Sequence, residues 1–278
     1  MDLHTHAKIN LALDVLERLD NGYHRVSMIM QSLELHDTVS VAPCDGGITL
    51  TASTQSIPCD ETNLAHRAAT LFFEHTGIRG GATIHIEKRI PVSAGLAGGS
   101  GNAAGVLRAL DLLYQTELGE ETLAELGARL GADVPFCLLT GTALAEGLGT
   151  ELTPLEPFPS TAVLLVKPDV EVSTAWAYRN FDLSNAGKLD VDGIAAHITD
   201  VEYVSAHMGN ALRTVTVPAH PEIARIEQKM LDCGALGAMM SGSGPTVFGL
   251  FANEDMARQA YHAFSQDDCF VALTRTVS

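Results

Sequence analysis

The stretch from Pro91 to Tyr114, PVSAGLAGGSGNAAGVLRALDLLY, places bare backbone directly before an amphipathic pattern. Five glycines fall within the eleven residues from Gly95 to Gly105. Glycine has no Cβ, so successive backbone N–H groups can approach a ligand closely, and the start of a helix adds the positive end of its dipole. The spacing therefore predicts a cradle for a phosphate group rather than an ordinary flexible connection.

The residues around these glycines indicate which type of phosphate-binding loop this is. A P-loop requires GxxxxGK[ST], and no lysine comes after the glycines here, so Walker-type binding is excluded. Gly99, Gly101 and Ala104 do fit the loose dinucleotide pattern GxGxxG/A. The preceding segment IHIEKRI is polar at alternate positions, unlike the buried first strand of a Rossmann unit, so dinucleotide binding is kept only as a minor alternative.

Two other segments carry side chains able to act on a phosphate. In AKINLALDV, apolar and polar residues alternate as in a half-buried strand, which puts Lys8 and Asn10 on the same face. A lysine in this position could equally extend its ammonium group to solvent at a sheet edge. Asp133 follows a predicted helix end and precedes Pro135 by two residues, which places it on a fixed turn, where an aspartate commonly bonds its own backbone.

The elements that must position these residues can be read along the chain. DNG at residues 20–22 predicts a turn between two strands, and Asn63 and Gly77 predict the ends of a helix. The helix after the glycine stretch could be capped by Ser100 or Asn102, and a further helix ends at Gly131.

The second half of the chain begins after the proline-rich stretch LTPLEPFPS at 152–160. We predict two domains, residues 1–155 and 156–278. The second contains a strand, a mostly polar stretch, a helix from Pro221 to Gly234, a strand–turn–strand around SGSG, a helix and a final strand that could return to the first domain.

Composition limits the class of protein. The 278 residues are 46% apolar and 18% charged with a mean hydropathy of +0.14, which predicts a packed globular protein. A net charge of −17 argues against a nucleic-acid surface. Five dispersed cysteines, no signal-peptide pattern and no long apolar run predict free thiols, no membrane and a cytoplasmic location. We expect a monomer or a weak homodimer.

Three ordered motifs together resemble the galactokinase, homoserine, mevalonate and phosphomevalonate (GHMP) kinase superfamily. They are AKINLALDVLERLDNGYHRV, PVSAGLAGGSGNAAGVL and MMSGSGPTVFGLF, and the similarity extends over essentially the whole chain. The resemblance implies a two-domain α+β fold. One domain would bind ATP and be of a ribosomal-protein-like type, the other would be ferredoxin-like and bind the substrate, and the active site would lie in the cleft between them.

Within the superfamily, GYH, GADVPF and AEGLG are most similar to kinases of a cytidylyl sugar alcohol in the non-mevalonate isoprenoid pathway. This similarity implies phosphoryl transfer from ATP, with Mg²⁺, to a 2-hydroxyl of a small cytidylyl substrate. Two alternatives stay open. One is a related kinase acting on homoserine, mevalonate or a sugar, and the other is a non-catalytic sensor, which would have no need for both Lys8 and Asp133.

The resemblance also implies roles for individual residues. Lys8 and Asp133 match the catalytic pair. The expected ATP-binding residues are Pro91, Val92, Ser93, Ala94, Gly95, Leu96, Ala97, Gly98, Gly99, Ser100 and Gly101, together with Asn63 and Lys88, which would reach the adenosine. The Ser100 hydroxyl is a candidate contact for Mg²⁺ or a phosphate oxygen, with a helix cap as the alternative.

The cytidylyl substrate is expected to bind at residues Asn10, Tyr23, His24, Thr174 and Tyr178. Tyr23 and Tyr178 would form aromatic walls, and His24 would bond the edge of the base. The ordinary alternatives are hairpin packing for Tyr23 and a satisfied surface histidine for His24. The SGSG turn is expected beside the glycine loop. In that loop, Ala97, Gly101 and Asn102 replace the Gly, Ser and acidic residue that relatives often carry, which leaves the Mg²⁺ ligands open.

Overall fold

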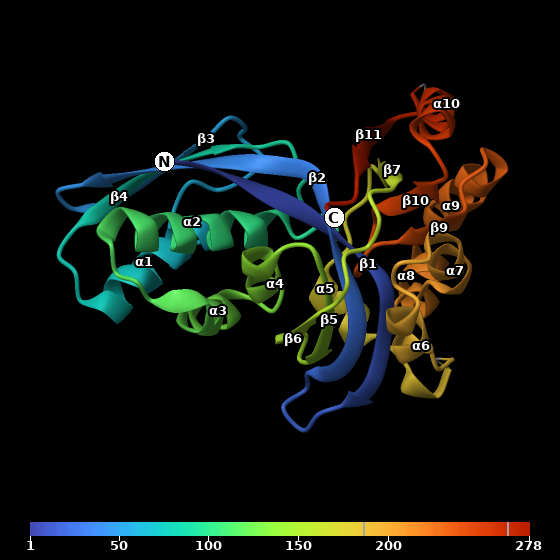
Figure 1. The fold of residues 1–278 in the computed structure, drawn as a ribbon, viewed down its shortest axis with the longest axis horizontal. Coiled ribbons are helices and arrows are strands. Elements are labelled where there is room, and N and C mark those ends of the chain that lie inside the picture. The colour runs from blue at the N-terminus through green and yellow to red at the C-terminus, as the bar shows by residue number, and fades with distance from the viewer. Residues whose placement is uncertain (186, 266) are drawn as a thin grey trace. The chain divides into compact units, whose positions relative to one another are not determined.

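The computed structural model describes residues 1–185, 187–265 and 267–278 and has the predicted α+β character (Figure 1). It divides into two compact units. The first consists of Met1–Ala7, Leu35–Val92 and Ala97–Thr140, and the second of Lys8–Glu34, Ser93–Leu96 and Gly141–Ser278. These bounds differ from a border at residue 155, because two long strands, β1 (Asp2–Arg18) and β2 (His24–Cys44), each contribute to both units.

The turn between β1 and β2 forms where the DNG sequence predicts it. Gly22 has a φ of +84°, and Leu19 N–H donates to the Tyr23 carbonyl over 2.8 Å. The expectation of a half-buried strand is wrong for β1, because its residues from Ala7 to Val15 are all buried. Lys8 is only 4% exposed, so it does not extend its ammonium group to solvent.

In the first unit, helices cover one side of a sheet (Figure 1). β3 (Gly47–Ala52) runs parallel to β4 (Gly81–Glu87), and β4 runs antiparallel to β2. The helices are α1 (Leu64–Thr76), α2 (Gly98–Tyr114), α3 (Gly119–Leu130) and α4 (Val134–Leu139). α2 contacts the other three helices through small and branched buried side chains, including Ala103, Leu107 and Leu110, and this packing fixes the direction of its N-terminus.

In the second unit, two groups of strands are found. β5 (Thr142–Gly147) pairs with β2 and with β6 (Glu151–Pro154), and the two-residue β8 (Gly209–Asn210) pairs in parallel with β1. The other group is a four-stranded antiparallel sheet. Its order is β11 (Cys269–Arg275), β7 (Ala162–Pro168), β10 (Val247–Phe251) and β9 (Gly237–Met240).

Two helices, α9 (Glu222–Asp232) and α10 (Glu254–Phe264), pack against the four-stranded sheet. The final strand β11 pairs with β7 in this sheet, so it lies in the second unit and does not return to the first. Asn63, Gly77, Gly131 and Pro221 bound helices as predicted.

The polar stretch after β7 contains helices that the sequence patterns did not predict. They are α5 (Thr174–Arg179), α6 (Val191–Ala196), α7 (Val201–His207) and α8 (Arg213–Ala219), with a 3₁₀ turn at Leu183–Asn185. Each is too short to show an apolar stripe, and only the capping residues Ser173, Asp190 and Asp200 mark their starts. Within the described ranges, no helix combines the length and apolar character needed to cross a membrane.

Candidate active site

The glycine stretch leads into the N-terminus of α2. The helix begins at Gly98, so Ser100 and Asn102 lie inside it and the prediction that either caps it is wrong. The N-cap is Ala97, whose φ of +57° is left-handed, and no side chain makes a capping hydrogen bond. This first turn also lacks an acidic residue, so the positive end of a 17-residue helix is not compensated from within the helix. Such an end fits a phosphate group.

Gly98 is required by close packing. A Cβ on this residue would lie 2.9 Å from Lys88 Nζ and 3.1 Å from an Ile90 methyl group. By contrast, a Cβ on Gly99 would be no closer than 3.6 Å to Leu64. Gly98 therefore lets α2 pack closely against Lys88 and Ile90, whereas the backbone at Gly99 has space around it for a ligand.

Lys88 lies in a buried ionic network beneath the start of α2. Its Nζ donates to Asp37 Oδ2 over 2.7 Å and also to the Ile90 carbonyl, and its side chain is 7% exposed. Asp37 Oδ1 accepts from the backbone N–H groups of Arg89 and Ile90. Burial lowers the pKa of Lys88, and the Asp37 carboxylate opposes that shift. The ammonium group of Lys88 thus connects Asp37 to the backbone at Ile90, directly before the glycine loop.

Asn102 belongs to the same network. With its amide nitrogen facing the acceptors, it donates to Asp37 Oδ2 over 3.0 Å, to Thr5 Oγ1 over 3.1 Å and to the Gly98 carbonyl over 3.2 Å. The side chain is buried. An amide suits this place because an acidic side chain would put a second carboxylate against Asp37.

Asp133 precedes α4 in the first unit. Its side chain makes no capping bond to that helix, although its carbonyl accepts from Cys137 N–H over 3.1 Å. Asp133 lies in a turn as predicted, and Pro135 is in the first turn of the helix. Ser100 is near this segment, since a Cβ on Gly131 would lie 4.0 Å from Ser100 Oγ. A hydroxyl and a carboxylate thus belong to neighbouring parts of the first unit.

Asn63 caps α1. Its Oδ1 accepts from Ala65 N–H over 2.9 Å, and its Nδ2 donates to the Pro58 carbonyl over 2.7 Å. Both ends of the amide are thus engaged in local structure.

In the second unit, Lys8 and Asn10 form a buried pair. Lys8 Nζ donates to Asn10 Oδ1 over 2.7 Å, which confirms that the two side chains share a face of β1. The SGSG turn, Ser241 to Gly244, lies directly against them. A Cβ on Gly242 would be 3.4 Å from Lys8 Nζ and 3.6 Å from Asn10 Oδ1.

The turn also contacts part of the glycine loop, as expected. Ser241 Oγ donates to the Gly95 carbonyl over 3.0 Å, and a Cβ on Gly95 would overlap the Ser241 carbonyl. Lys8 N–H donates to the Leu96 carbonyl over 3.1 Å. Bare backbone is therefore needed at Gly95 because the two segments pass so closely.

An aromatic group surrounds His24. The imidazole is buried, with its ring centroid 5.4 Å from that of Tyr178 and 6.3 Å from that of Phe181. Burial and, to a smaller extent, the charge of Arg18 lower the pKa of His24. Phe181 was missed by sequence reasoning, although its place three residues after Tyr178 is a signal that could have found it. Tyr23 is 65% exposed, unlike its neighbour His24.

Thr174 connects the aromatic group to the SGSG turn. Its hydroxyl lies 2.9 Å from Ser243 Oγ, and Thr174 begins the helix that carries Tyr178. His24, Tyr178, Thr174, the turn and Lys8 are thereby linked through direct contacts within the second unit.

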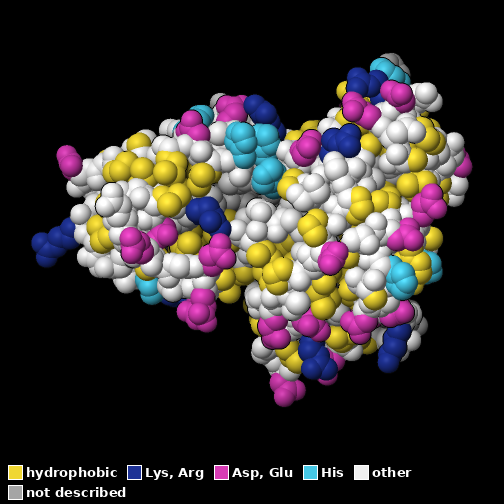
Figure 2. All heavy atoms as spheres, viewed as in Figure 1, with side chains coloured by type: hydrophobic (Ala, Val, Ile, Leu, Met, Phe, Trp, Pro, Cys, Tyr) yellow, Lys and Arg dark blue, Asp and Glu magenta, His cyan; other side chains and the backbone are white. Residues whose placement is uncertain are grey.

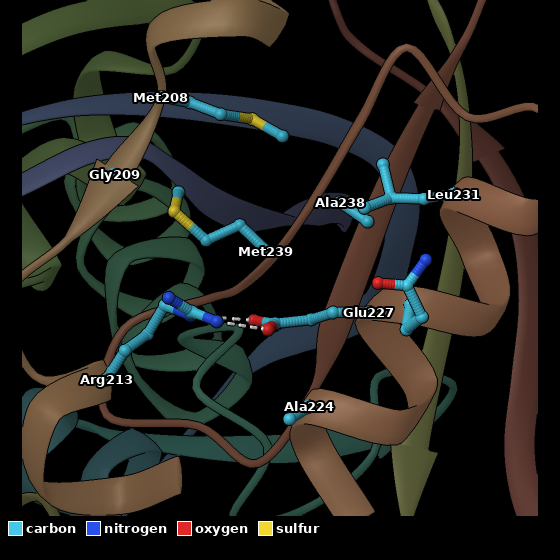
Figure 3. A pocket seen from close by; sticks show the side chains of 9 residues that line it. Met208, Gly209, Arg213, Ala224, Glu227, Leu231, Ala238 and Met239 are labelled. Atoms are coloured by element: carbon cyan, nitrogen blue, oxygen red, sulfur yellow. Dashed lines mark hydrogen bonds and ion pairs between the residues drawn. The ribbon is translucent and has the colours of Figure 1, made fainter.

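Two other features carry polar side chains outside this group. A hollow of about 320 Å³ is lined by Met208 and by residues of β8, α8, α9 and β9, none of which was predicted as a site residue (Figure 3). A patch of histidine side chains is visible in Figure 2, and the rings of His4 and His36 stack with centroids 4.1 Å apart. Among the described residues, no group of three or more His, Cys, Asp and Glu side chains is arranged to hold a metal ion.

Comparison with family models places both halves of the chain. Residues 63–141 match the GHMP kinases N terminal domain, and residues 194–268 match the GHMP kinases C terminal domain. Among solved structures, a 4-(cytidine 5'-diphospho)-2C-methyl-D-erythritol kinase is 35% identical with a TM-score of 0.86, covering all of both chains. A homoserine kinase from Cytophaga hutchinsonii, 20% identical with a TM-score of 0.78 over 100% of this chain and 94% of its own, shares the fold.

Curated relatives are similar over nearly their full length. The 4-diphosphocytidyl-2-C-methyl-D-erythritol kinase of Lachnoclostridium phytofermentans is 46% identical over 95% of this chain and 92% of its own. That of Pelotomaculum thermopropionicum is 47% identical over 97% and 96%. The chain therefore belongs to the GHMP kinase family and is a kinase, that is, a phosphotransferase.

Proposed function

We propose that this kinase transfers the γ-phosphoryl group of ATP to the 2-hydroxyl of 4-diphosphocytidyl-2-C-methyl-D-erythritol, a step in isoprenoid precursor synthesis by the non-mevalonate pathway. Its similarity to kinases of this name supports the substrate, and membership of the GHMP kinases implies ATP as the donor. Fold alone would not select the acceptor, so we assign it from particular side chains.

One observation carries the proposal. Within the second unit, His24 and Tyr178 lie together, Thr174 ties their group to Ser243, and the adjacent Gly242 faces Lys8. A base-binding aromatic group is thus joined to a buried cation through a single turn. This arrangement supports a substrate that combines a base with a reacting hydroxyl.

The cytosine would be recognised by stacking and by its polar edge. A ring stacks on any base, whereas hydrogen bonds to the base edge discriminate between bases. The lowered pKa keeps His24 neutral near pH 7, so its imidazole offers one donor and one acceptor. We assign the edge contact to His24 and a wall to Tyr178, with Tyr23 as a wall reached from the exposed surface.

The triphosphate would bind at the N-terminus of α2 and along residues 91–101. The uncapped first turn supplies N–H donors, and the open Cα of Gly99 allows close approach. Bound Mg²⁺ would neutralise phosphate charge, and the Ser100 hydroxyl is the contact that we propose for it. Lys88 and Asn63 stay proposed contacts for adenosine, although their side chains bond Asp37 and Ala65 N–H within the protein.

Phosphoryl transfer depends mainly on positioning and charge neutralisation. We propose that Lys8 stabilises the transferred group while Asn10, bonded to it, orients the ammonium. Asp133, whose carboxylate does not cap α4, would accept the proton from the attacking hydroxyl.

The cellular setting is part of the proposal. All five cysteines are free thiols, which suits the reducing cytoplasm. On the face shown in Figure 2, Lys and Arg side chains are scattered among Asp and Glu rather than gathered into a stripe, which argues against nucleic-acid binding. A monomer or weak homodimer remains a prediction that light scattering would test.

The test is coupled ADP release by purified protein with ATP and Mg²⁺. The acceptors are 4-diphosphocytidyl-2-C-methyl-D-erythritol, homoserine and mevalonate, with a reaction lacking acceptor as the blank. We expect turnover only with the cytidylyl acceptor. Turnover with homoserine or mevalonate instead would refute the proposed substrate, and ATP binding without any turnover would favour a sensor.

A further inference from the structure

Asn210 is a buried amide at the end of β8, where that strand pairs with Leu13 of β1. The residue is 8% exposed, and both the amide nitrogen and the amide oxygen of its side chain form hydrogen bonds. Its Nδ2 donates to the Met240 carbonyl over 2.9 Å and to the Gly242 carbonyl over 2.8 Å, while Oδ1 accepts from Leu212 N–H over 3.0 Å. Two peptide groups two residues apart are thereby held by one amide.

The Gly242 carbonyl belongs to the part of the SGSG turn that faces Lys8. Gly242 has a φ of +58°, and its Cα side is close enough to Lys8 Nζ that a Cβ would lie 3.4 Å away. Neighbouring parts of the turn have their own bonds, since Thr216 Oγ1 donates to the Ser243 carbonyl and Ser241 N–H to the Thr246 carbonyl. Rotation of the Gly242 peptide, by contrast, is opposed by Asn210.

The strand end that leads into the turn is also held through the N–H group of Met240. Met240 N–H donates to Glu227 Oε1 over 3.1 Å, and Glu227 is paired with Arg213, whose Nε lies 2.9 Å from the same oxygen (Figure 3). Arg213 follows Asn210 by only three residues. The segment from Asn210 to Arg213 therefore fixes the peptide groups on both sides of Met240. Asn210 bonds the Met240 carbonyl directly, and Arg213 orients the Glu227 carboxylate that accepts from Met240 N–H.

We propose that Asn210 is a positioning residue for phosphoryl transfer. It fixes the Gly242 carbonyl and so holds the bare face of Gly242 against the Lys8–Asn10 pair. Its effect on catalysis rests on the role of Lys8 in the proposed function, whereas its effect on the turn does not.

The test is Asn210→Asp, which keeps the size of the side chain and the acceptor for Leu212 N–H. The second oxygen would replace the donor and face two carbonyl oxygens. We expect kcat to fall about 10- to 100-fold near pH 7, the range for unsatisfied buried polar groups, with both KM values changed far less. As the pH falls and the new carboxyl takes up a proton, its O–H can donate to one carbonyl, so kcat relative to wild type should partly recover.

The matched control is Asn253→Asp, the same chemical change at the N-cap of α10, where an aspartate still accepts from Met256 N–H. We expect no change in kcat. Asn210→Ser is the milder variant should the aspartate prevent folding, because a hydroxyl can still accept from Leu212 N–H but does not reach the turn. Unchanged kcat in a folded Asn210 variant, with wild type active, would overturn the proposal.

Hydrogen exchange separates failure of this inference from failure of the proposed function, because it needs no substrate. We expect the amides of residues 241–244 to exchange faster in the Asn210 variants while α10 and β11 keep wild-type protection. Unchanged exchange in the turn would overturn the inference even if activity fell. If wild type fails to phosphorylate the cytidylyl acceptor, the proposed substrate is wrong, and the exchange result alone decides the role of Asn210.

Discussion

At the residue scale, the candidate site depends on polar groups that are buried but partnered. Lys8 bonds Asn10, and Lys88 bonds Asp37. A buried ammonium group is costly unless a partner compensates for lost hydration. These pairs differ in one respect that matters for function. Lys88 donates to a carboxylate and holds structure, whereas Lys8 donates to the neutral amide of Asn10.

Asp133 is the proposed proton acceptor, so its charge rather than its shape should matter. We expect Asp133→Asn to leave ATP affinity nearly unchanged and to lower kcat by about 10²-fold or more, as for loss of a general base. Calorimetry with a non-hydrolysable ATP analogue and steady-state kinetics would measure the two effects. Glu125→Gln on the exposed side of α3 is the control. Wild-type turnover in Asp133→Asn would exclude the aspartate from proton transfer.

His24 is the proposed reader of the cytosine edge. His24→Ala should raise KM for the cytidylyl acceptor at least about tenfold, the loss typical of an unpaired polar contact, and change KM for ATP little. His262→Ala, at the exposed end of α10, is the matched control. Equal changes in both KM values would assign His24 to structure.

The same residue predicts a pH dependence. The folded pKa of His24 is lower than its ordinary value of about 6.5, so the neutral form is favoured in the folded protein. The resulting contribution to stability is fully present above that ordinary value and is lost as the pH falls through the lowered one. KM for the cytidylyl acceptor should therefore be flat above pH 6.5 and rise in acid, where protonation removes the imidazole acceptor.

At the element scale, the N-terminus of α2 has one side packed on a buried polar network and an uncapped first turn. The network consists of Asp37, Lys88 and Asn102, and the uncapped turn leaves backbone N–H groups available to a ligand. Ala97 occupies a left-handed position that costs a non-glycine residue roughly 1–2 kcal/mol. The loop geometry is thus retained by packing in spite of local strain.

Gly98 and Gly99 should respond differently to the same substitution. Gly98→Ala puts a methyl group against Lys88 and Ile90, both held by Asp37, and should destabilise the protein by about 1–3 kcal/mol. Gly99→Ala meets no close atom and should leave stability unchanged or slightly higher, because alanine favours a helix, yet weaken ATP binding by blocking open backbone. Thermal unfolding and ATP titration of both variants would decide. Equal stability losses would contradict the different packing of the two glycines.

At the scale of the whole molecule, the two compact units share the strands β1 and β2. A cut at residue 155 would therefore separate residues 8–34, which belong to the second unit and carry Lys8, Asn10 and His24, from most of that unit. Neither unit can be built from one continuous segment of the chain. Each unit is accordingly assembled from residues distant in sequence.

Shared strands should make unfolding cooperative. Urea unfolding followed by fluorescence of Trp176, the single tryptophan and part of the second unit, should coincide with unfolding followed by far-ultraviolet circular dichroism, which reports on both units. The fragment 156–278 should not fold by itself. Two separated transitions, or a folded fragment, would show that the units are independent.

Much of the site could be predicted because short motifs fix local chemistry. The turn after β1, the cap at Asn63, the loop before α2 and the SGSG hairpin each depend on residues close together in sequence. The contacts of Lys88 and Asn102 could not be predicted, because their partner Asp37 is more than fifty residues away. The short helices between β7 and α9 also escaped prediction, since six or seven residues do not establish a period.

The sequence by itself determined the family, the glycine loop and the placement of Lys8 and Asn10 on one face, because these depend on motif order and on strand periodicity. Only the tertiary structure decided that β1 is buried on both faces, that Lys88 bonds Asp37 beside the start of α2 and that Asn210 holds the turn facing Lys8. The physical reason is that a hydrogen bond between distant segments depends on where packing brings them, and no local pattern of residues encodes that meeting point.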